Sequence, residues 1–282
     1  MKGLYVETLG TGPRIVLVHG SISPGWGTWE AQRPLAERFR LVLPHRSGYP
    51  PNPSLERIDF ERQAEETAAL LEPGDHLAGH SYGGVVTLLA AARRPEAVRS
   101  LTVIEPPAFG MAAGDPVVAA ASLWFDRLFV SERDPARLLP SFLRLLGGAA
   151  GPRRRLSPAL EAGVRALMSE RPPSEARVPL AALRAASIPT LVVSSGEQPP
   201  FEAICHALAE ALGAERAVIP GAGHAVQRTG APFNERFVEF LERAEAAASS
   251  GAGAEAADTS QSAGRAAAAV AGAPATRGVP LR

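Results

Sequence analysis

The sequence has little of what several large classes of protein require. Its single cysteine, Cys205, excludes an internal disulfide framework and a cysteine-built zinc site. No uninterrupted apolar run reaches the roughly 18 residues that a membrane-spanning helix needs. Lys2 is the only lysine, and the 29 basic residues, nearly all arginine, are balanced by 29 acidic ones. With no net charge, the chain gives no reason to expect a nucleic-acid or anionic-membrane partner.

The N-terminus also lacks the apolar segment of a signal peptide, because MKGLYVETLGTG turns polar by Glu7. An apolar content of 46% over 282 residues is enough for a sizeable core, in one large domain or two smaller ones. We therefore expect a soluble, cytoplasmic protein that uses no cofactor and binds no metal, nucleic acid or membrane. The sequence does not predict its oligomeric state.

Short apolar runs alternate with longer helical patterns along most of the chain. Runs rich in Val, Leu and Ile and ended by turn residues predict buried strands at 14–20, 40–48, 100–107, 188–196 and 215–223. Helical patterns lie between them at 30–38, 60–71, 82–93, 201–212 and 232–247. This alternation predicts an α/β fold with a mostly parallel central sheet and helices on both faces. Catalytic groups in such a sheet belong at the carboxyl ends of its strands.

One long segment, 108–186, interrupts the alternation, because it shows helical patterns and no strand pattern. We interpret it as a helical cap inserted between the strands that end near residues 105 and 195. The last part of the chain is rich in Ala, Gly and Ser without apolar periodicity, which is typical of a disordered tail. The predicted organisation is a core at 1–107 and 187–247, a cap at 108–186 and a tail at 248–282.

A candidate nucleophile lies in Gly79-His80-Ser81-Tyr82-Gly83, which fits the pattern G-x-S-x-G. A short strand precedes the motif and the helical run VVTLLAAARR follows it. On a sharp strand-to-helix turn, flanking glycines allow close packing and the serine hydroxyl projects from the sheet. The alternative is a glycine-rich turn with an ordinary serine. The strand–turn–helix context favours the nucleophile.

A base for this serine is expected on a loop after the last strand, where VIPGAGHAV places His224 behind two glycines. We expect His80, beside the serine, to face away from the reacting centre. His19 follows a strand as part of HG, and the remaining histidines lie in a strand end, a turn and a helix, where a structural or solvated role is more common: His45, His76 and His206.

With these motifs, the chain resembles the α/β-hydrolase superfamily over roughly residues 4 to 243. VLVHGS resembles the strand and HG turn of that family, GHSYGG its nucleophile elbow and PGAGH its histidine loop, in the family's order. The resemblance implies a sheet of the eight-stranded type and a Ser–acid–His triad. It also implies an oxyanion hole formed by the backbone N–H groups of Ser21 and Tyr82.

The acid of the triad departs from the family pattern. Family members usually carry an aspartate three residues beyond the glycine of the segment that reads TLVVSSG here, but this sequence has Pro199 there. No aspartate occurs between Asp134 and Asp258, so an acid from this region must be a glutamate. We favour Glu105, because it closes an apolar strand where a carboxylate needs a partner, and some family members place their acid there. The alternatives are Glu197, Glu202 or no acid at all.

The resulting functional hypothesis is a cofactor-free serine hydrolase that cleaves a carboxylic ester, lactone or thioester through an acyl-enzyme. A cap rich in Ala, Leu, Val and Phe favours a substrate with an apolar portion. A biosynthetic acyltransferase or cyclase of the same fold is one alternative. A ligand-binding protein that has lost turnover is another, and the missing aspartate is its best argument.

Overall fold

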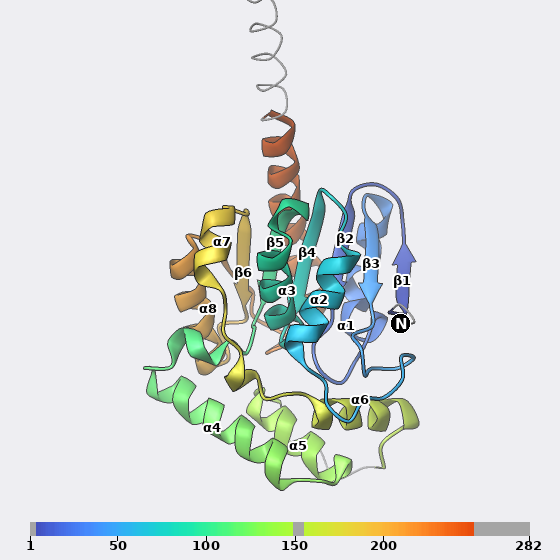
Figure 1. Cartoon of the computed structure of the whole chain (residues 1–282), viewed down its shortest axis with the longest axis vertical. Helices are drawn as coiled ribbons and strands as arrows, with labels where there is room; N and C mark the ends of the chain where they lie inside the picture. The colour runs from blue at the N-terminus through green and yellow to red at the C-terminus, as the bar shows by residue number, and fades with distance from the viewer. Residues whose placement is uncertain (1–3, 149–154, 251–282) are drawn as a thin grey trace, which may run out of the picture. The chain divides into compact units, whose positions relative to one another are not determined.

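A seven-stranded sheet forms the centre of the protein in the computed structural model, which describes residues 4–148 and 155–250 (Figure 1). The strand order is β1-β3-β2-β4-β5-β6-β7, and only β1 runs antiparallel to its neighbour. The predicted α/β fold with a mostly parallel sheet is confirmed. The strands are β1 (Val6–Leu9), β2 (Arg14–Val18), β3 (Arg40–Pro44), β4 (Asp75–His80), β5 (Val98–Ile104), β6 (Thr190–Ser194) and β7 (Glu215–Val218).

The structure differs from the sequence prediction in one strand, in the number of strands and in the type of one helix. Strand β1 was not predicted, because VETL is short and only partly buried at the sheet edge. Within the described residues the sheet has seven strands, whereas the family resemblance implied the eight-stranded type. The segment predicted as a helix at 30–38 is a 3₁₀ helix, η1 (Glu30–Glu37). In an α-helix the ring of Pro34 would clash with the carbonyl four residues earlier, which disfavours α-helical geometry in this segment.

Alternating side chains of the strands enter two cores on opposite faces of the sheet. Ile15 and Leu17 of β2 pack in one cluster, while Val16 and Val18 pack in the other, as the two-residue period of a strand requires. Helices α1 (Trp26–Trp29) and η1 and the helical residues 231–241 supply the first cluster. The second is supplied by α2 (Phe60–Leu70), α3 (Tyr82–Arg93) and α8 (Pro199–Leu212).

Among the described residues, four α-helices and two short 3₁₀ helices lie between β5 and β6, and we call residues 108–186 the insertion. Helices α4, α5 and α6 each begin with a proline behind a capping Asp or Ser, namely Asp115, Asp134 and Ser157. Figure 1 shows these three helices across the end of the sheet to which the parallel strands point. The helices are α4 (Pro116–Ser131), α5 (Pro135–Leu145), α6 (Pro158–Ser169) and α7 (Leu180–Ala186).

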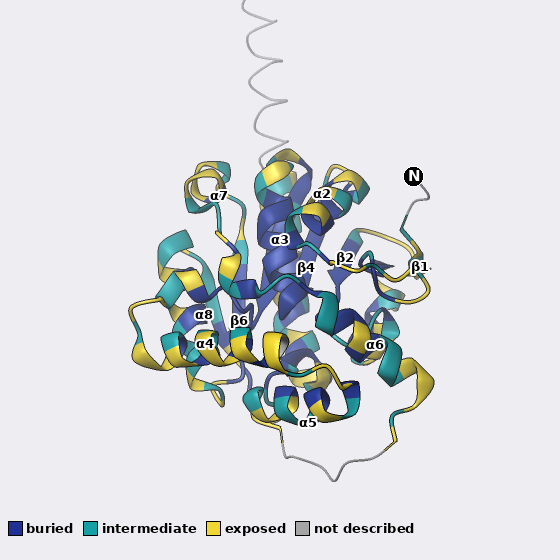
Figure 2. Cartoon of the chain, turned by 60° about the horizontal axis from the view of Figure 1, so that its bottom comes forward, coloured by how far each residue is buried: buried dark blue, intermediate teal, exposed yellow. Residues whose placement is uncertain are grey.

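The insertion has a core of its own. Phe125, Phe142 and Val164 from three different helices meet in one buried cluster, together with Ile204 of α8. Figure 2 shows the contrast with the centre of the fold, since α3 is buried along most of its length whereas α4 has an exposed side. The apolar pattern that predicted helices in this segment therefore corresponds to a folded helical layer.

The end of the chain forms a second unit, Glu242–Arg282, of which residues 242–250 are described and helical. The tail predicted at 248–282 lies outside the described residues from 251 onward. In the described part of the chain, no helix combines the length and apolar character that crossing a bilayer would require.

Candidate active site

Ser81 occupies a strained turn between β4 and α3. Its φ of +53° and ψ of −125° are unusual for a residue other than glycine. Gly79 and Gly83 make the turn tight. A Cβ on Gly79 would come within 2.4 Å of the Gly83 carbonyl oxygen, and one on Gly83 within 2.4 Å of the His19 carbonyl oxygen. The two glycines of the motif are therefore required by close backbone packing, and they hold Ser81 at the carboxyl end of β4.

A continuous hydrogen-bond chain links Ser81, His224 and Glu105. The Ser81 hydroxyl lies 2.8 Å from Nε2 of His224, and Nδ1 of His224 lies 2.7 Å from Oε2 of Glu105. Because an ionised carboxylate only accepts, Nδ1–H donates to Glu105 and Nε2 is left to accept from the serine. The side chains of His224 and Glu105 are 6% and 1% exposed. This is the geometry that a buried base and its orienting acid need.

Glu105 directly follows β5 with a φ of +41°, a second strained residue at the site. Its Oε1 accepts two hydrogen bonds from Ser195, one from the backbone N–H and one from the hydroxyl, both 2.7 Å long. Burial by itself raises the pKa of Glu105. The hydrogen bond and charge of His224 and the two bonds from Ser195 outweigh that effect and hold its pKa below the ordinary value. The carboxylate is therefore ionised at neutral pH.

The two other candidate acids have different partners. The Glu197 carboxylate accepts from the backbone N–H groups of Gly221 and Gly223, at 2.7 and 3.0 Å, and so fixes the loop that carries His224. Glu202 pairs with Arg216 at 2.5 Å and accepts from a serine hydroxyl of β6. Of the three glutamates considered, Glu105 is the one that forms a hydrogen bond with His224.

The lowered pKa of Glu105 predicts a pH dependence of stability. A carboxyl whose pKa is lower in the folded chain stabilises that state above its ordinary pKa of 4.5, and this contribution is lost as pH falls through the folded value. In Glu105→Gln the ionisable carboxyl group is absent, so this pH-dependent contribution is absent too. We expect the difference in free energy of unfolding between wild type and this variant to shrink between pH 6 and pH 3 in urea denaturation. A difference that stays constant would contradict the assigned environment.

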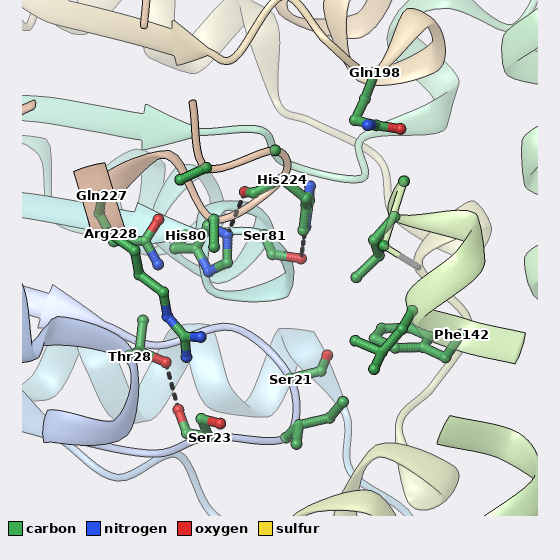
Figure 3. A pocket seen from close by; sticks show the side chains of 18 of the residues that line it. Ser21, Ser23, Thr28, His80, Ser81, Phe142, Gln198, His224, Gln227 and Arg228 are labelled. Atoms are coloured by element: carbon green, nitrogen blue, oxygen red, sulfur yellow. Dashed lines mark hydrogen bonds between the residues drawn. The ribbon is translucent and has the colours of Figure 1, made fainter. Parts of the chain in front are cut away.

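A pocket of about 560 Å³ opens onto Ser81 and His224. Its two sides differ in character. Figure 3 shows Phe142 on one side of Ser81, and Thr28, Gln227 and Arg228 on the other. The insertion lines the first side with leucines that continue the apolar surface, namely Leu139, Leu143, Leu146 and Leu160. One side of the pocket is thus suited to an apolar chain, and the other to a polar group.

Two residues have roles that sequence reasoning missed. Ser195, which received no role, donates twice to Glu105. The one feature of the sequence that could have indicated this role is the position of Ser195 directly after β6, near the place where the family usually carries its acid. His80 was expected to face away from the site, and this was wrong. Its Nε2–H donates to the His224 backbone carbonyl at 2.9 Å, and its ring lines the pocket. Burial lowers the pKa of His80, so that ring is neutral.

Both predicted oxyanion residues line a cavity with Ser81. Ser21 follows β2 and lines the main pocket, and Tyr82 is the first residue of α3, directly after Ser81. Ser21, Ser81 and Tyr82 also line one small cavity together. Their role as donors stays a prediction. Among the described residues, no group of three His, Cys, Asp or Glu side chains could hold a metal ion.

Comparison with known proteins assigns the family. The model of the Alpha/beta hydrolase family matches residues 15–239. The chain belongs to the alpha/beta hydrolase family. An alpha/beta hydrolase from Sphaerobacter thermophilus has the same fold, with a TM-score of 0.65 and 24% identity over 84% of this chain and 96% of that one.

Two curated relatives of this alpha/beta hydrolase are closer in sequence. A pimeloyl-[acyl-carrier protein] methyl ester esterase of Methylococcus capsulatus is 35% identical over 184 residues, which are 64% of this chain and 70% of that protein. A dihydrolipoyllysine-residue acetyltransferase component of the acetoin cleaving system of Pseudomonas putida is 31% identical over 254 residues, 82% of this chain and 64% of that protein. The protein is a hydrolase of this family.

Proposed function

We propose that the protein is a serine esterase in which Ser81 is the nucleophile, His224 the general base and Glu105 the acid that orients the base. The observation that carries this proposal is the hydrogen-bond chain from Ser81 through His224 to Glu105. The substrate is a carboxylic ester, with lactones and thioesters as chemically related substrates. No cofactor is needed, because the three side chains supply every proton transfer.

The reaction follows from the protonation states in the site. As Oγ of Ser81 attacks the ester carbonyl, Nε2 of His224 takes its proton and Glu105 stabilises the imidazolium. The backbone N–H groups of Ser21 and Tyr82 donate to the tetrahedral oxyanion. The intermediate collapses, and the alcohol leaves with the proton from His224. Water then attacks the acyl-enzyme with His224 as base again, which releases the acid and restores Ser81.

The acyl part of the substrate is proposed to lie on the apolar side of the pocket, where the insertion acts as a cap. Phe142 and the leucines of that side offer contacts to methylene groups and no charge. The name of the Methylococcus capsulatus relative supports this assignment, since that protein acts on the methyl ester of an acyl chain. We therefore propose an ester with an aliphatic acyl portion.

Labelling with a fluorophosphonate tests the proposal directly. The reagent forms a covalent bond only with a serine activated as a nucleophile, so we expect one phosphonylated residue, found by peptide mass spectrometry at Ser81. Heat-denatured protein is the control and should stay unlabelled. Native protein that is not labelled would favour the ligand-binding alternative.

The apolar side of the pocket predicts a chain-length series. Each methylene that becomes buried adds about 0.8 kcal/mol, or about fourfold in kcat/KM, until the pocket is full. We expect kcat/KM for p-nitrophenyl esters to rise from acetate toward the medium-length acids. Leu146→Ala, in the pocket wall, should flatten the series, whereas Leu123→Ala on the exposed side of α4 should not. A flat wild-type series would contradict the assignment.

Acyl transfer is a second candidate, favoured by the Pseudomonas putida relative that is named as an acetyltransferase component. The same acyl-enzyme serves both reactions, and the acceptor decides between them. Product analysis in the presence of added alcohols or thiols separates the two. A transferase gives mainly the transferred ester or thioester at low acceptor concentration, while an esterase gives mainly the free acid.

A further inference from the structure

Glu170 is a buried carboxylate outside the Ser81–His224–Glu105 chain. It directly follows α6, and the backbone on either side of it is fixed, because Ile58 donates to the Ser169 carbonyl and Arg171 donates to the Ile58 carbonyl, both at 2.7 Å. Its side chain is 1% exposed. Removing a carboxylate from water costs several kcal/mol unless good partners replace the solvent. The identity of those partners therefore points to its role.

All three partners of Glu170 converge on the turn at residues 20–22. Oε2 accepts from the hydroxyl of Ser21 at 2.6 Å. Oε1 accepts from the guanidinium of Arg46 at 2.6 Å and from the hydroxyl of Tyr49 at 2.8 Å. Arg46 in turn donates to the backbone carbonyl of Gly20 at 2.9 Å. The turn is thus held through a side chain by Glu170 and through its backbone by Arg46.

The same turn has a strained backbone and is packed closely against the insertion. Ile22 has a φ of +75°, which is rare for a β-branched residue. Its N–H points to the Tyr49 hydroxyl oxygen at 3.4 Å. A Cβ on Gly163 of α6 would come within 2.0 Å of the Ile22 carbonyl oxygen, so α6 contacts the turn backbone directly. Such a conformation persists only where its surroundings impose it.

The second proposed oxyanion donor is held by the same group of residues. The Arg46 guanidinium lies 4.7 Å from the centre of the Tyr82 ring and 4.6 Å from that of Tyr49. The Tyr82 hydroxyl donates to the backbone carbonyl of Arg171, the residue after Glu170, at 3.1 Å. The turn of Ser21 and the side chain of Tyr82 are therefore both held by Arg46 and by the segment that follows α6.

We propose that Glu170 and Arg46 are positioning residues that hold the N–H groups of Ser21 and Tyr82 in place for the oxyanion, so that the docked insertion is required for catalysis. This inference rests on the proposed function. A buried ion pair contributes little net stability compared with apolar side chains of similar volume. A role in aligning the oxyanion donors explains why Glu170 and Arg46 are charged. Displacement of such a donor by a fraction of an ångström weakens binding of the transition state.

Two mild variants test the role. Glu170→Gln keeps the shape but replaces one acceptor oxygen with an N–H₂ donor, which conflicts with Ser21 or Arg46. Ser21→Ala removes only the hydroxyl and keeps the backbone N–H. We expect kcat to fall about 10- to 100-fold in the first and about tenfold in the second, with KM nearly unchanged. Glu161→Gln is the matched control, because its carboxylate pairs with Arg165 on the exposed side of α6 and contacts none of these residues.

The affinity for a boronic acid inhibitor is a second measurement, and it would not change if Glu170 and Ser21 had only a structural role. It bonds to Oγ of Ser81 and places a tetrahedral oxygen in the oxyanion site. We expect its affinity to fall by the same factor as kcat/KM in both variants, measured well below the melting temperature of each, since loss of a partner of the buried carboxylate also lowers stability. If both variants kept the wild-type kcat/KM and the wild-type affinity for the boronate, the inference would be wrong. The esterase proposal would still be supported in that case by the labelling of Ser81.

The double variant Arg46→Met/Glu170→Met separates positioning from folding. Each single methionine substitution leaves one uncompensated buried charge and should destabilise the protein, whereas the double variant removes both charges and should regain stability. We expect its kcat to remain about tenfold or more below wild type, because the turn has lost its hydrogen bonds. Recovery of kcat together with stability would show that the pair acts only in folding. If the double variant does not fold, Ser21→Ala decides.

Discussion

Replacing Ser81 by alanine is expected to lower kcat by about 10⁴- to 10⁶-fold and to abolish fluorophosphonate labelling. The hydroxyl removed is the one that lies 2.8 Å from His224. No acyl-enzyme can form without it, and the remaining rate comes only from the oxyanion donors and from substrate binding. The measurements are kcat on p-nitrophenyl esters and the mass of the protein after labelling.

Ser54→Ala serves as the control for this experiment, because Ser54 is exposed on a loop. It should keep wild-type activity and labelling. Retention of the label in Ser81→Ala would show that a different serine reacts. The assignment of the nucleophile, and with it the proposed mechanism, would then be wrong.

Glu105→Gln is expected to lower kcat by about 10²- to 10⁴-fold while the protein stays folded. Glutamine can donate an N–H to Nδ1 of His224, which favours the tautomer in which Nε2 cannot accept the serine proton. It also removes the charge that stabilises the imidazolium. The expected loss therefore appears in kcat more than in KM, as measured over a range of ester concentrations.

The two other glutamates provide matched controls for this substitution. Glu202→Gln changes a carboxylate that pairs with Arg216, so its activity should stay near that of wild type. Glu197→Gln weakens the hold on Gly221 and Gly223 and should have an intermediate effect through the His224 loop. A large loss in Glu197→Gln with full activity in Glu105→Gln would make Glu197 the acid.

Local patterns in the sequence were enough to predict the fold. Apolar runs such as 14–20 and 100–107 overlap β2 and β5, because a strand buried on both faces needs an apolar residue at nearly every position. The turn of Ser81 was predictable because its two glycines stand at fixed places in a local motif, between a strand and a helix. Strand β1 was not, since its few residues alternate weakly and are stabilised by pairing with β3.

The contacts around the site depend on residues far apart in the chain, and these the sequence could not predict. Ser195 and Glu105 are separated by 90 positions, and Glu170 is 149 positions from Ser21. Neither pair leaves a local pattern, because each is created by the way the sheet and the insertion pack. Glu105 could be favoured in advance for a different reason, since a carboxylate that ends a buried strand requires a partner.

The position of Glu105 directly after β5 has an evolutionary consequence for the loop after β6. In the proposed arrangement, Gln198 lines the pocket without holding a proton-transfer group, and Pro199 begins α8 where the family commonly has its acid. Mutations at Gln198 can therefore alter which esters enter while the chemistry of Ser81 is retained. Selection acting at Gln198 would diversify substrate preference one substitution at a time, while every intermediate keeps Ser81, His224 and Glu105.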